Sequence, residues 1–351
     1  TGYLRLWPYE YNQLNVRGQW SAILNDITDV TADVFLGLGR SCARCHDHKF
    51  DPLLQRDYFS LQAFVAGIRF IDEPIFPTEA ARADYEKQRA AWEAKTADLR
   101  ARIDALAGPI RQRQTDAAVN QFPPDIQVIM RKPPAERTPG EQQLYELSYR
   151  QMQYRVRGPT KGKQKAEYGQ LKKELDASGE PPIPLAMIAR DIGAQAAEVV
   201  VPGGRKGTVA VEPAFPTVFG ESTPEIVPSA SSTGRRAALA NWLTHKDHPL
   251  TARVMVNRIW QGHFGAGLVA TPSDFGTLGD KPSHPELLDW LTVEFVEHGW
   301  SLKHLHRLIA TSAVYRQASV GTRKDGMDGE NRLLGRMSVR RLDAEQVRDA
   351  M

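Results

Sequence analysis

Residues 283–309 give the strongest fold signal in the chain and read SHPELLDWLTVEFVEHGWSLKHLHRLI. Their apolar residues recur every three or four positions, which is the period of an amphipathic helix. Gly299 is typical of a helix end, and Ser301 is typical of a residue that caps the next helix. The run Ser283-His284-Pro285-Glu286 has the form of a capping box. We therefore predict two helices joined by a tight turn.

Helical patterns continue around this stretch, over residues 233–351. Apolar residues repeat at helical spacing in residues 237–243 and 254–260, and Gly265 marks a helix end. We predict a C-terminal helical bundle in residues 233–351. Because the chain begins with Thr1 and stops inside a helical pattern, we expect it to be part of a longer protein, with this domain truncated at its end.

The first predicted unit spans residues 1–75 and is also helical. Apolar residues repeat at helical spacing over residues 20–34, and Gly37 and Gly39 then break the pattern. A second helix is expected over residues 58–65. The chain's two cysteines lie between these helices.

Residues 78–178 predict a charged helical or coiled-coil arm. Tyr85, Trp92, Leu99 and Leu106 recur every seven residues, and Gly108-Pro109 is expected to stop the helix. A returning arm is expected after residue 144. The part from residue 131 to 178 holds eleven Lys and Arg against six Asp and Glu. It is either a basic docking arm for an acidic partner or a solvated helical hairpin.

Residues 179–232 are rich in Pro and Gly. Residues 198–201 and 208–211 predict a small β-hairpin, and a linker is expected from Ser222 to Ser232. The predicted fold class is therefore mainly α. It comprises a helical N-terminal unit, a helical-hairpin insert, a small β-hairpin segment and a C-terminal helical bundle.

Composition excludes several protein classes. The 351 residues are 41% hydrophobic and 25% charged, so the chain can form hydrophobic cores. A net charge of +3 is too small to indicate a nucleic-acid partner. No apolar run approaches the ~18 residues of a membrane span, so we expect none in this chain.

The chemical signal of the sequence is Cys42-Ala43-Arg44-Cys45-His46, which contains both cysteines of the chain. C-x-x-C-H is the attachment pattern of c-type haem. Two thioether bonds would hold the porphyrin, and His46 would be the proximal ligand of the iron. The alternatives are a zinc site that uses Cys42, Cys45 and either His46 or His48, a disulfide, and plain buried thiols.

The remaining ligands of such a site are open. His48 lies too close to His46 to reach the opposite haem face, so it is either a hydrogen-bonding neighbour of the site or an alternative metal ligand. A sixth iron ligand could come from several residues, and the site could also be five-coordinate. The candidates are Met130, Met152, Met187, Met255, His263 and His284.

The two ends of the chain resemble a pair of families. Residues 34–52, with Cys42-Ala43-Arg44-Cys45-His46-Asp47-His48-Lys49-Phe50-Asp51-Pro52, resemble the end of domain of unknown function 1549. The C-terminal third is similar to its companion, domain of unknown function 1553. The stretches that carry the second resemblance are Asn257-Arg258-Ile259-Trp260, residues 264–269, residues 272–276, His284-Pro285-Glu286-Leu287-Leu288-Asp289, Tyr315-Arg316-Gln317 and Arg340-Arg341-Leu342-Asp343-Ala344-Glu345.

This resemblance implies a biological setting rather than a reaction. Similar proteins are large exported planctomycete-type proteins, often linked to a planctomycete cytochrome C domain and associated with sulfatases and polysaccharide breakdown. It implies a periplasmic or extracellular location, with a redox protein or polysaccharide-processing enzymes as possible partners.

Polar residues in the C-terminal motifs suggest a second candidate site. Arginine side chains bind carboxylates and sulfates in bidentate fashion. Such a cluster would bind an anion, or it would form an internal network of ion pairs and caps. The residues concerned are Asn257, Arg258, Arg316, Arg340 and Arg341.

The leading hypothesis is an exported protein that carries one c-type haem and acts in electron transfer or redox chemistry. The alternative is a secreted glycan-binding or scaffold module whose C-x-x-C-H is structural. A zinc hydrolase using Asp47 or Asp51 is a third interpretation. Whether the protein is an enzyme is left open.

Overall fold

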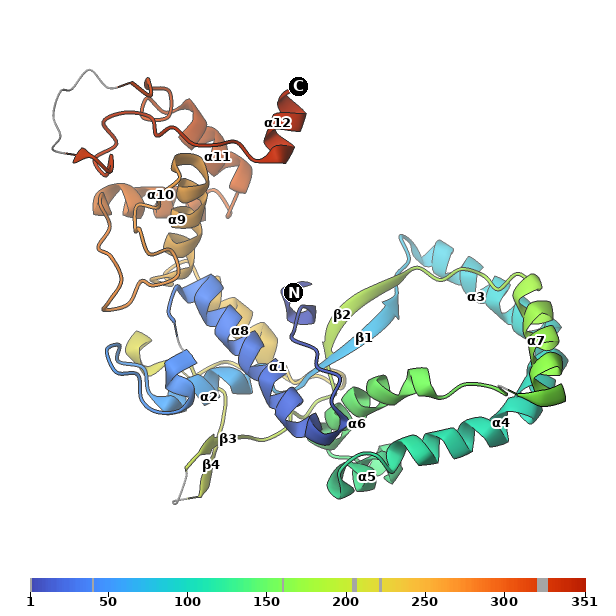
Figure 1. Cartoon of the computed structure of the whole chain (residues 1–351). Coiled ribbons are helices and arrows are strands. Elements are labelled where there is room, and N and C mark those ends of the chain that lie inside the picture. The colour runs from blue at the N-terminus through green and yellow to red at the C-terminus, as the bar shows by residue number, and fades with distance from the viewer. Residues whose placement is uncertain (1, 40, 160, 204–206, 221–222, 321–327) are drawn as a thin grey trace. The chain divides into compact units, whose positions relative to one another are not determined.

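The computed structural model describes residues 2–39, 41–159, 161–203, 207–220, 223–320 and 328–351. Over these residues the fold is mainly helical, as predicted, with two small antiparallel sheets of two strands each (Figure 1). Only one of the two sheets, the hairpin, was expected from the sequence. The chain forms two compact units, each assembled from separate segments. Unit 1 contains residues 1–27, 65–199 and 226–235, and unit 2 contains residues 28–64, 200–225 and 236–351. The four-segment division of the sequence stays a prediction.

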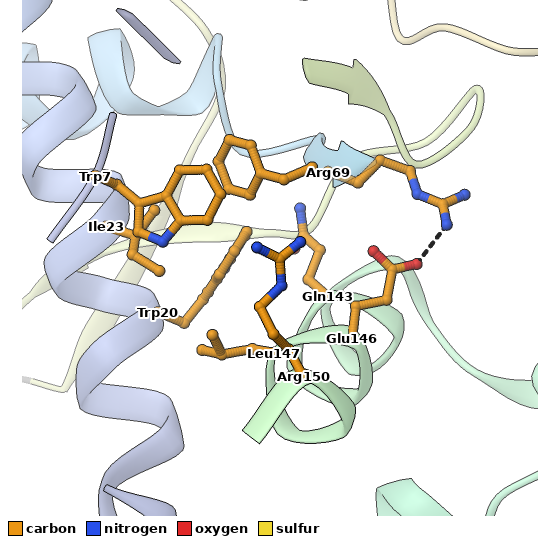
Figure 2. A pocket seen from close by; sticks show the side chains of 9 residues that line it. Trp7, Trp20, Ile23, Arg69, Gln143, Glu146, Leu147 and Arg150 are labelled. Atoms are coloured by element: carbon orange, nitrogen blue, oxygen red, sulfur yellow. Dashed lines mark hydrogen bonds and ion pairs between the residues drawn. The ribbon is translucent and has the colours of Figure 1, made fainter. Parts of the chain in front are cut away.

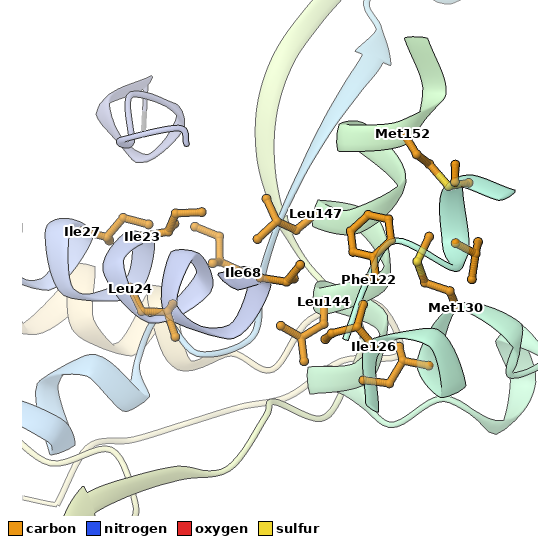
Figure 3. Close-up of a cluster of buried hydrophobic side chains, with 14 of the residues drawn as sticks. Ile23, Leu24, Ile27, Ile68, Phe122, Ile126, Met130, Leu144, Leu147 and Met152 are labelled. Atoms are coloured by element: carbon orange, nitrogen blue, oxygen red, sulfur yellow. The ribbon is translucent and has the colours of Figure 1, made fainter. Parts of the chain in front are cut away.

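Unit 1 is built around a cluster of buried side chains from α1, β1, α4, α5 and α6 (Figure 3). Ile23 and Ile27 of helix α1 face Ile68 of strand β1, and Leu144 of helix α6 packs into the same cluster. Gln143 of α6 is buried and donates to the carbonyl oxygens of Ala66 and Ile68, both at 2.7 Å. These bonds hold α6 against β1. The elements of this unit are α1 (Val16–Thr31, continuing into unit 2), β1 (Ile68–Pro74), α3 (Glu79–Lys95), α4 (Ala97–Val119), α5 (Pro124–Arg131), α6 (Pro139–Met152), α7 (Gly162–Ala177) and β2 (Leu185–Asp191).

The first sheet pairs β1 with β2 antiparallel, with Ile68 opposite Asp191. The buried carboxylate of Asp191 accepts hydrogen bonds from the Thr233 backbone N–H and hydroxyl, both at 2.8 Å. It also accepts one from the Ser232 hydroxyl at 2.7 Å. The end of the expected linker is therefore fastened to the sheet, whereas Ser222 at its start lies outside the described residues.

The predicted arm is helical, but the expected stop at Gly108-Pro109 is wrong. α4 continues through Pro109 to Val119, and the break lies at Thr96, between α3 and α4. Pro109 has no N–H, so the carbonyl of Ala105, four residues earlier, has no helical partner. Both residues are exposed, so water can bind that carbonyl instead. The returning arm is confirmed as α6 and α7, and α7 packs against α4.

Unit 2 contains the cysteines and the C-terminal helices. A second buried cluster forms the core of this unit and includes Trp260 of α9, Phe295 of α10 and Leu305 of α11. The predicted hairpin is confirmed as β3 (Val199–Pro202, which begins in unit 1) and β4 (Thr208–Val211). The other elements are the π-helical turn Ala32–Leu36, the 3₁₀ turn Ser41–Arg44, α2 (Gln55–Ala63), α8 (Arg235–Leu243), α9 (Thr251–Phe264), α10 (Pro285–Glu297), α11 (Leu302–Thr311) and α12 (Ala344–Ala350).

The ends of α10 and α11 test the sequence signals directly. Gly299 has φ 65° and ends α10, and the Ser301 hydroxyl caps α11 by accepting from the His304 N–H at 3.2 Å. Both predictions are confirmed. The capping box is wrong: α10 begins at Pro285 with His284 as its N-cap and no side-chain cap. Pro285 fixes a helical φ and starts the helix there, one residue later than an N-cap at Ser283 requires.

Candidate functional site

The C-x-x-C-H loop begins where the π-helical turn ends, at Gly37. This residue has φ 58°, a conformation that favours glycine. A β-carbon added there would lie 2.8 Å from the Phe275 ring and 2.9 Å from Val254. The Phe275 N–H also donates to the Gly37 carbonyl at 2.7 Å. The start of the loop is thus held against the C-terminal helices of the same unit.

Cys42 lies on the 3₁₀ turn Ser41–Arg44, and Cys45 follows it directly. Both cysteines are exposed, and neither forms a disulfide. The Cys45 N–H donates to the Cys42 carbonyl at 3.3 Å, which closes the turn. Side chains three residues apart in a 3₁₀ turn lie on the same side. Ala43, between the cysteines, is 1% exposed and packs inward. The turn therefore presents both thiols on one outer face.

His46 is exposed beside the thiols. Its Nδ1 lies 2.7 Å from the carbonyl oxygen of Asp47. Because a carbonyl oxygen can only accept, Nδ1 is the donor in this contact, and Nε2 is the nitrogen left for a metal. Metal-binding histidines commonly donate their other ring N–H in this way.

The other polar residues of the loop fasten it in place. The Arg44 guanidinium pairs with the Asp29 carboxylate at 2.8 Å, and Asp47 accepts the Gln55 N–H at 2.8 Å at the start of α2. The Gln55 side chain donates back to the Arg44 carbonyl at 3.0 Å. Burial, with the negative charge of Asp29, raises the pKa of Tyr58, so this hydroxyl stays protonated.

His48 points inward, unlike His46. Its Nδ1 accepts the Asp51 N–H at 2.9 Å and lies 3.3 Å from the Asp51 carboxylate. Asp51 in turn accepts the Thr277 N–H at 2.6 Å, and a β-carbon on Gly276 would lie 2.6 Å from the same carboxylate. The side chains of His48 and Asp51 are only 12% and 10% exposed. Asp51 therefore holds the loop on the segment between α9 and α10, and His48 binds Asp51 from within the loop.

The proposed sixth ligands lie in several different environments. Met130 and Met152 are buried in the unit 1 core, and Met255 packs against the unit 2 core. Met187 is 71% exposed on β2. His263 pairs with His306, and His284 contacts the Ser283 hydroxyl.

The polar residues of the second candidate site do not act as one cluster. Asn257 is fully buried, and its amide bonds the Val269 N–H at 2.8 Å and carbonyl at 2.9 Å. Arg258 donates to the backbone carbonyls of Asp33 and Val34 at 2.7 and 2.8 Å. Arg316, Arg340 and Arg341 are exposed, and Arg340 donates to the Gly262 carbonyl.

Unit 1 holds an aromatic cleft that was not predicted (Figure 2). It comprises two pockets that share Trp7 and Arg150. One, about 30 Å³, is also lined by Trp20 and by the Arg69–Glu146 ion pair with its 2.6 Å distance. The other, about 380 Å³, is also lined by Tyr9, Tyr11 and Met187.

Stacking fixes the walls of this aromatic cleft. The Trp7 ring stacks on Phe70 with centroids 3.8 Å apart, and the Arg150 guanidinium lies 5.8 Å from the Trp7 centroid. Burial is the main cause that raises the pKa of Tyr9, while the charge of Arg150 opposes it. The alternation Trp7-Pro8-Tyr9-Glu10-Tyr11 was the available sequence signal, because residues at alternate positions of an extended segment share a face.

Two family models match the chain. Residues 1–70 match PSCyt2, a protein of unknown function (DUF1549), and residues 235–351 match PSD1, a protein of unknown function (DUF1553). The resemblance stated from the sequence is thereby confirmed. No curated protein and no solved structure matches the chain.

The two matched domains meet within unit 2. The loop that bears Cys42 and Cys45 belongs to DUF1549, and Thr277, which binds its Asp51, belongs to DUF1553. Arg258 of DUF1553 likewise donates to backbone carbonyls of DUF1549. Among the described residues, no helix has both the length and the apolar character needed to cross a bilayer.

Proposed function

We propose that the chain carries one haem attached through thioether bonds to Cys42 and Cys45, with His46 as an axial ligand, and that it takes part in electron transfer. The observation that carries the proposal is that only some polar side chains of the loop are bonded to their neighbours. Arg44, Asp47 and Asp51 bind neighbouring backbone or side chains, whereas the thiols and His46 face outward.

The residues present fit this group chemically. Two reduced thiols share one face of a turn, and the next residue offers an imidazole nitrogen with a lone pair. Phe50 and Leu54, which come later in the same loop, have half-exposed side chains that offer apolar surface to a porphyrin. Haem, when bound, supplies a one-electron iron couple. The cytochrome-like short name of the first domain agrees with this chemistry.

The protein's own contribution is to position the ligands. The Asp47 carbonyl fixes the tautomer of His46, and the Arg44–Asp29 pair fixes the turn that holds the thiols. An exported setting suits the proposal, because the resemblance from the sequence implies export. A redox partner would then approach the exposed face of the loop.

Export into a periplasm equipped for cytochrome c maturation provides the test. We expect one covalent haem per chain in a pyridine haemochrome spectrum of the denatured protein. Cys45→Ser should abolish stable attachment, and His46→Ala should change the visible spectrum of the folded protein. His245→Ala, an exposed histidine in the same unit, is the matched control. Unmodified protein with a correct fold would refute the haem assignment.

We further propose a second candidate function, binding of an acidic glycan in the aromatic cleft. Aromatic faces such as that of Trp7 stack on apolar sugar faces, while Arg150 offers a fork of donors to a carboxylate or sulfate. This is the specific observation that favours the glycan-binding alternative. In this second proposal the binding surface lies in unit 1 rather than on the C-terminal arginines.

A chondroitin sulfate tetrasaccharide and its desulfated form separate the contributions of stacking and charge. We expect binding of the sulfated form, measured by calorimetry, to weaken about tenfold or more in Arg150→Ala and in Trp7→Ala. Arg348→Ala, an exposed arginine of α12, should bind normally. Equal affinity of all four proteins would exclude the cleft as the binding site.

A further inference from the structure

Three side chains with metal-ligand atoms converge where α10 meets α11. Glu294 and His298 are four residues apart at the end of α10, so they lie on one helix face. His304 comes from the first turn of α11. One ligand atom from each of the three lies within 4.8 Å of the others.

One carboxylate oxygen contacts both imidazoles. Oε2 of Glu294 lies 3.3 Å from Nδ1 of His298 and 3.3 Å from Nε2 of His304. The two rings stack with centroids 3.8 Å apart and planes 9° apart, so their edges face the carboxylate together. The side chains remain 24–46% exposed, which leaves a path for an ion from solvent.

The turn between the helices keeps these donors together. Gly299 and Trp300 have φ 65° and 59°, and the Trp300 N–H donates to the Phe295 carbonyl at 2.9 Å. The Trp300 ring packs edge-on against the buried Phe295 at 5.2 Å. On the other side of the turn, the Ser301 cap fixes the His304 backbone, and Leu305 is fully buried. The three ligand residues therefore project from a packed corner rather than from a loose loop.

We propose that Glu294, His298 and His304 bind one divalent transition-metal ion, and that this ion is zinc. Two imidazoles and one carboxylate form a set that suits zinc, and three protein ligands leave a position for water. Nδ1 of His298 also lies 2.9 Å from the backbone carbonyl oxygen of Glu294, so zinc would replace the proton that this nitrogen donates there. The stacked rings would turn about χ2 to direct their nitrogens at one ion, and this torsion is broad in histidine. The site shares no residue with the Cys42–His46 loop and does not depend on its occupant.

Zinc chloride titrated into the full chain after chelator treatment tests the proposal by calorimetry. We expect one zinc ion per chain at this site and a higher Tm with zinc. Glu294→Gln, His298→Ala and His304→Ala should each weaken binding by about tenfold or more. His306→Ala is the matched control, because it lies two residues from His304 on α11 and its Nδ1 instead faces His263 Nε2 at 2.8 Å.

The absorption spectrum of the wild-type protein loaded with cobalt(II) distinguishes this site from a thiolate site. A His and carboxylate site gives no thiolate-to-metal charge-transfer band, and Cys42→Ser/Cys45→Ser should retain the zinc. Far-UV circular dichroism of the metal-free variants shows whether each one folds, and Glu294→Gln changes the shape of its site least. The proposal is overturned if His304→Ala binds zinc like the wild type, if His306→Ala loses as much affinity, or if the zinc depends on the thiols.

Discussion

The Cys42–Asp51 loop and the Asn257–Arg258 pair are both dense in polar side chains, yet the structure uses them in opposite ways. In the loop, Arg44, His48 and Asp51 bind their surroundings, so the thiols and His46 are left facing outward. Asn257 and Arg258 direct their hydrogen bonds mainly to backbone groups. Polar density alone therefore does not mark a site. A ligand atom that faces outward from a rigid frame is better evidence.

If this comparison holds, the largest loss of stability should come from the inward-facing Asn257. Asn257→Ala leaves the N–H and carbonyl of Val269 without partners in the interior, and we expect a loss of about 3 kcal/mol in the free energy of unfolding. Urea denaturation measures it. Asn241→Ala on the exposed face of α8 is the control. Equal stability of the two variants would show that the Val269 backbone finds other partners.

His248 should give the next largest effect, as a dependence of stability on pH. Burial lowers its pKa from 6.5 to about 4, while its Nδ1 accepts the N–H groups of Leu250 and Thr251 at 3.2 and 3.1 Å. Between pH 6.5 and about 4, His248 therefore binds a proton in the unfolded chain but stays neutral in the folded chain. Stability should be fully present above pH 6.5 and fall by about 2 kcal/mol by pH 4.5.

Urea denaturation at pH 7 and pH 4.5 tests this dependence. His248→Gln should flatten the pH profile, whereas His245→Gln on the exposed surface should not. An unchanged slope in His248→Gln would assign the pH dependence to other groups.

A smaller effect is expected at Asp51, which holds the outward-facing thiols in place indirectly. Asp51→Ala removes the acceptor of the Thr277 N–H, and we expect a loss of about 1–2 kcal/mol. The loop should also become a better protease substrate between residues 41 and 54. Limited proteolysis with mass spectrometry measures this, with the exposed Asp280→Ala as control. An unchanged digestion pattern would mean that Gly37 and Arg44 hold the loop without Asp51.

The smallest effect should come from the outward-facing residues themselves. In protein without haem, Cys42→Ser/Cys45→Ser and His46→Ala should each change the free energy of unfolding by less than about 0.5 kcal/mol, because these side chains are exposed. A loss as large as that at Asn257 would contradict the comparison, because the thiols would then belong to the packing.

The sequence was most informative where structure depends on neighbouring residues. Ser301 and Gly299 predicted the helix boundaries correctly, because a cap acts within one turn. The pairing of Ile68 with Asp191 was missed, since nothing near either residue specifies a partner so far along the chain. Pro109 was wrongly predicted to end the helix. The free energy that a proline costs inside a helix depends on whether the unpaired carbonyl, here that of Ala105, reaches water.

The candidate sites follow the same rule. Cys42, Cys45 and His46 were found because their spacing is itself the chemical signal. Glu294, His298 and His304 were missed because their convergence requires the turn at Gly299 and Trp300. The aromatic cleft was missed because Arg150 reaches Trp7 only after α6 is bound to β1 through Gln143.

The bond between Asp51 and Thr277 joins residues 226 positions apart. During synthesis from the N-terminus, Cys42 and Cys45 emerge well before the segment that will hold their loop. If haem is attached as proposed, a maturation enzyme that acts during or soon after synthesis would meet the two thiols while the backbone around them is still unfolded. The order of synthesis would give such an enzyme a flexible pentapeptide before folding fixes its backbone.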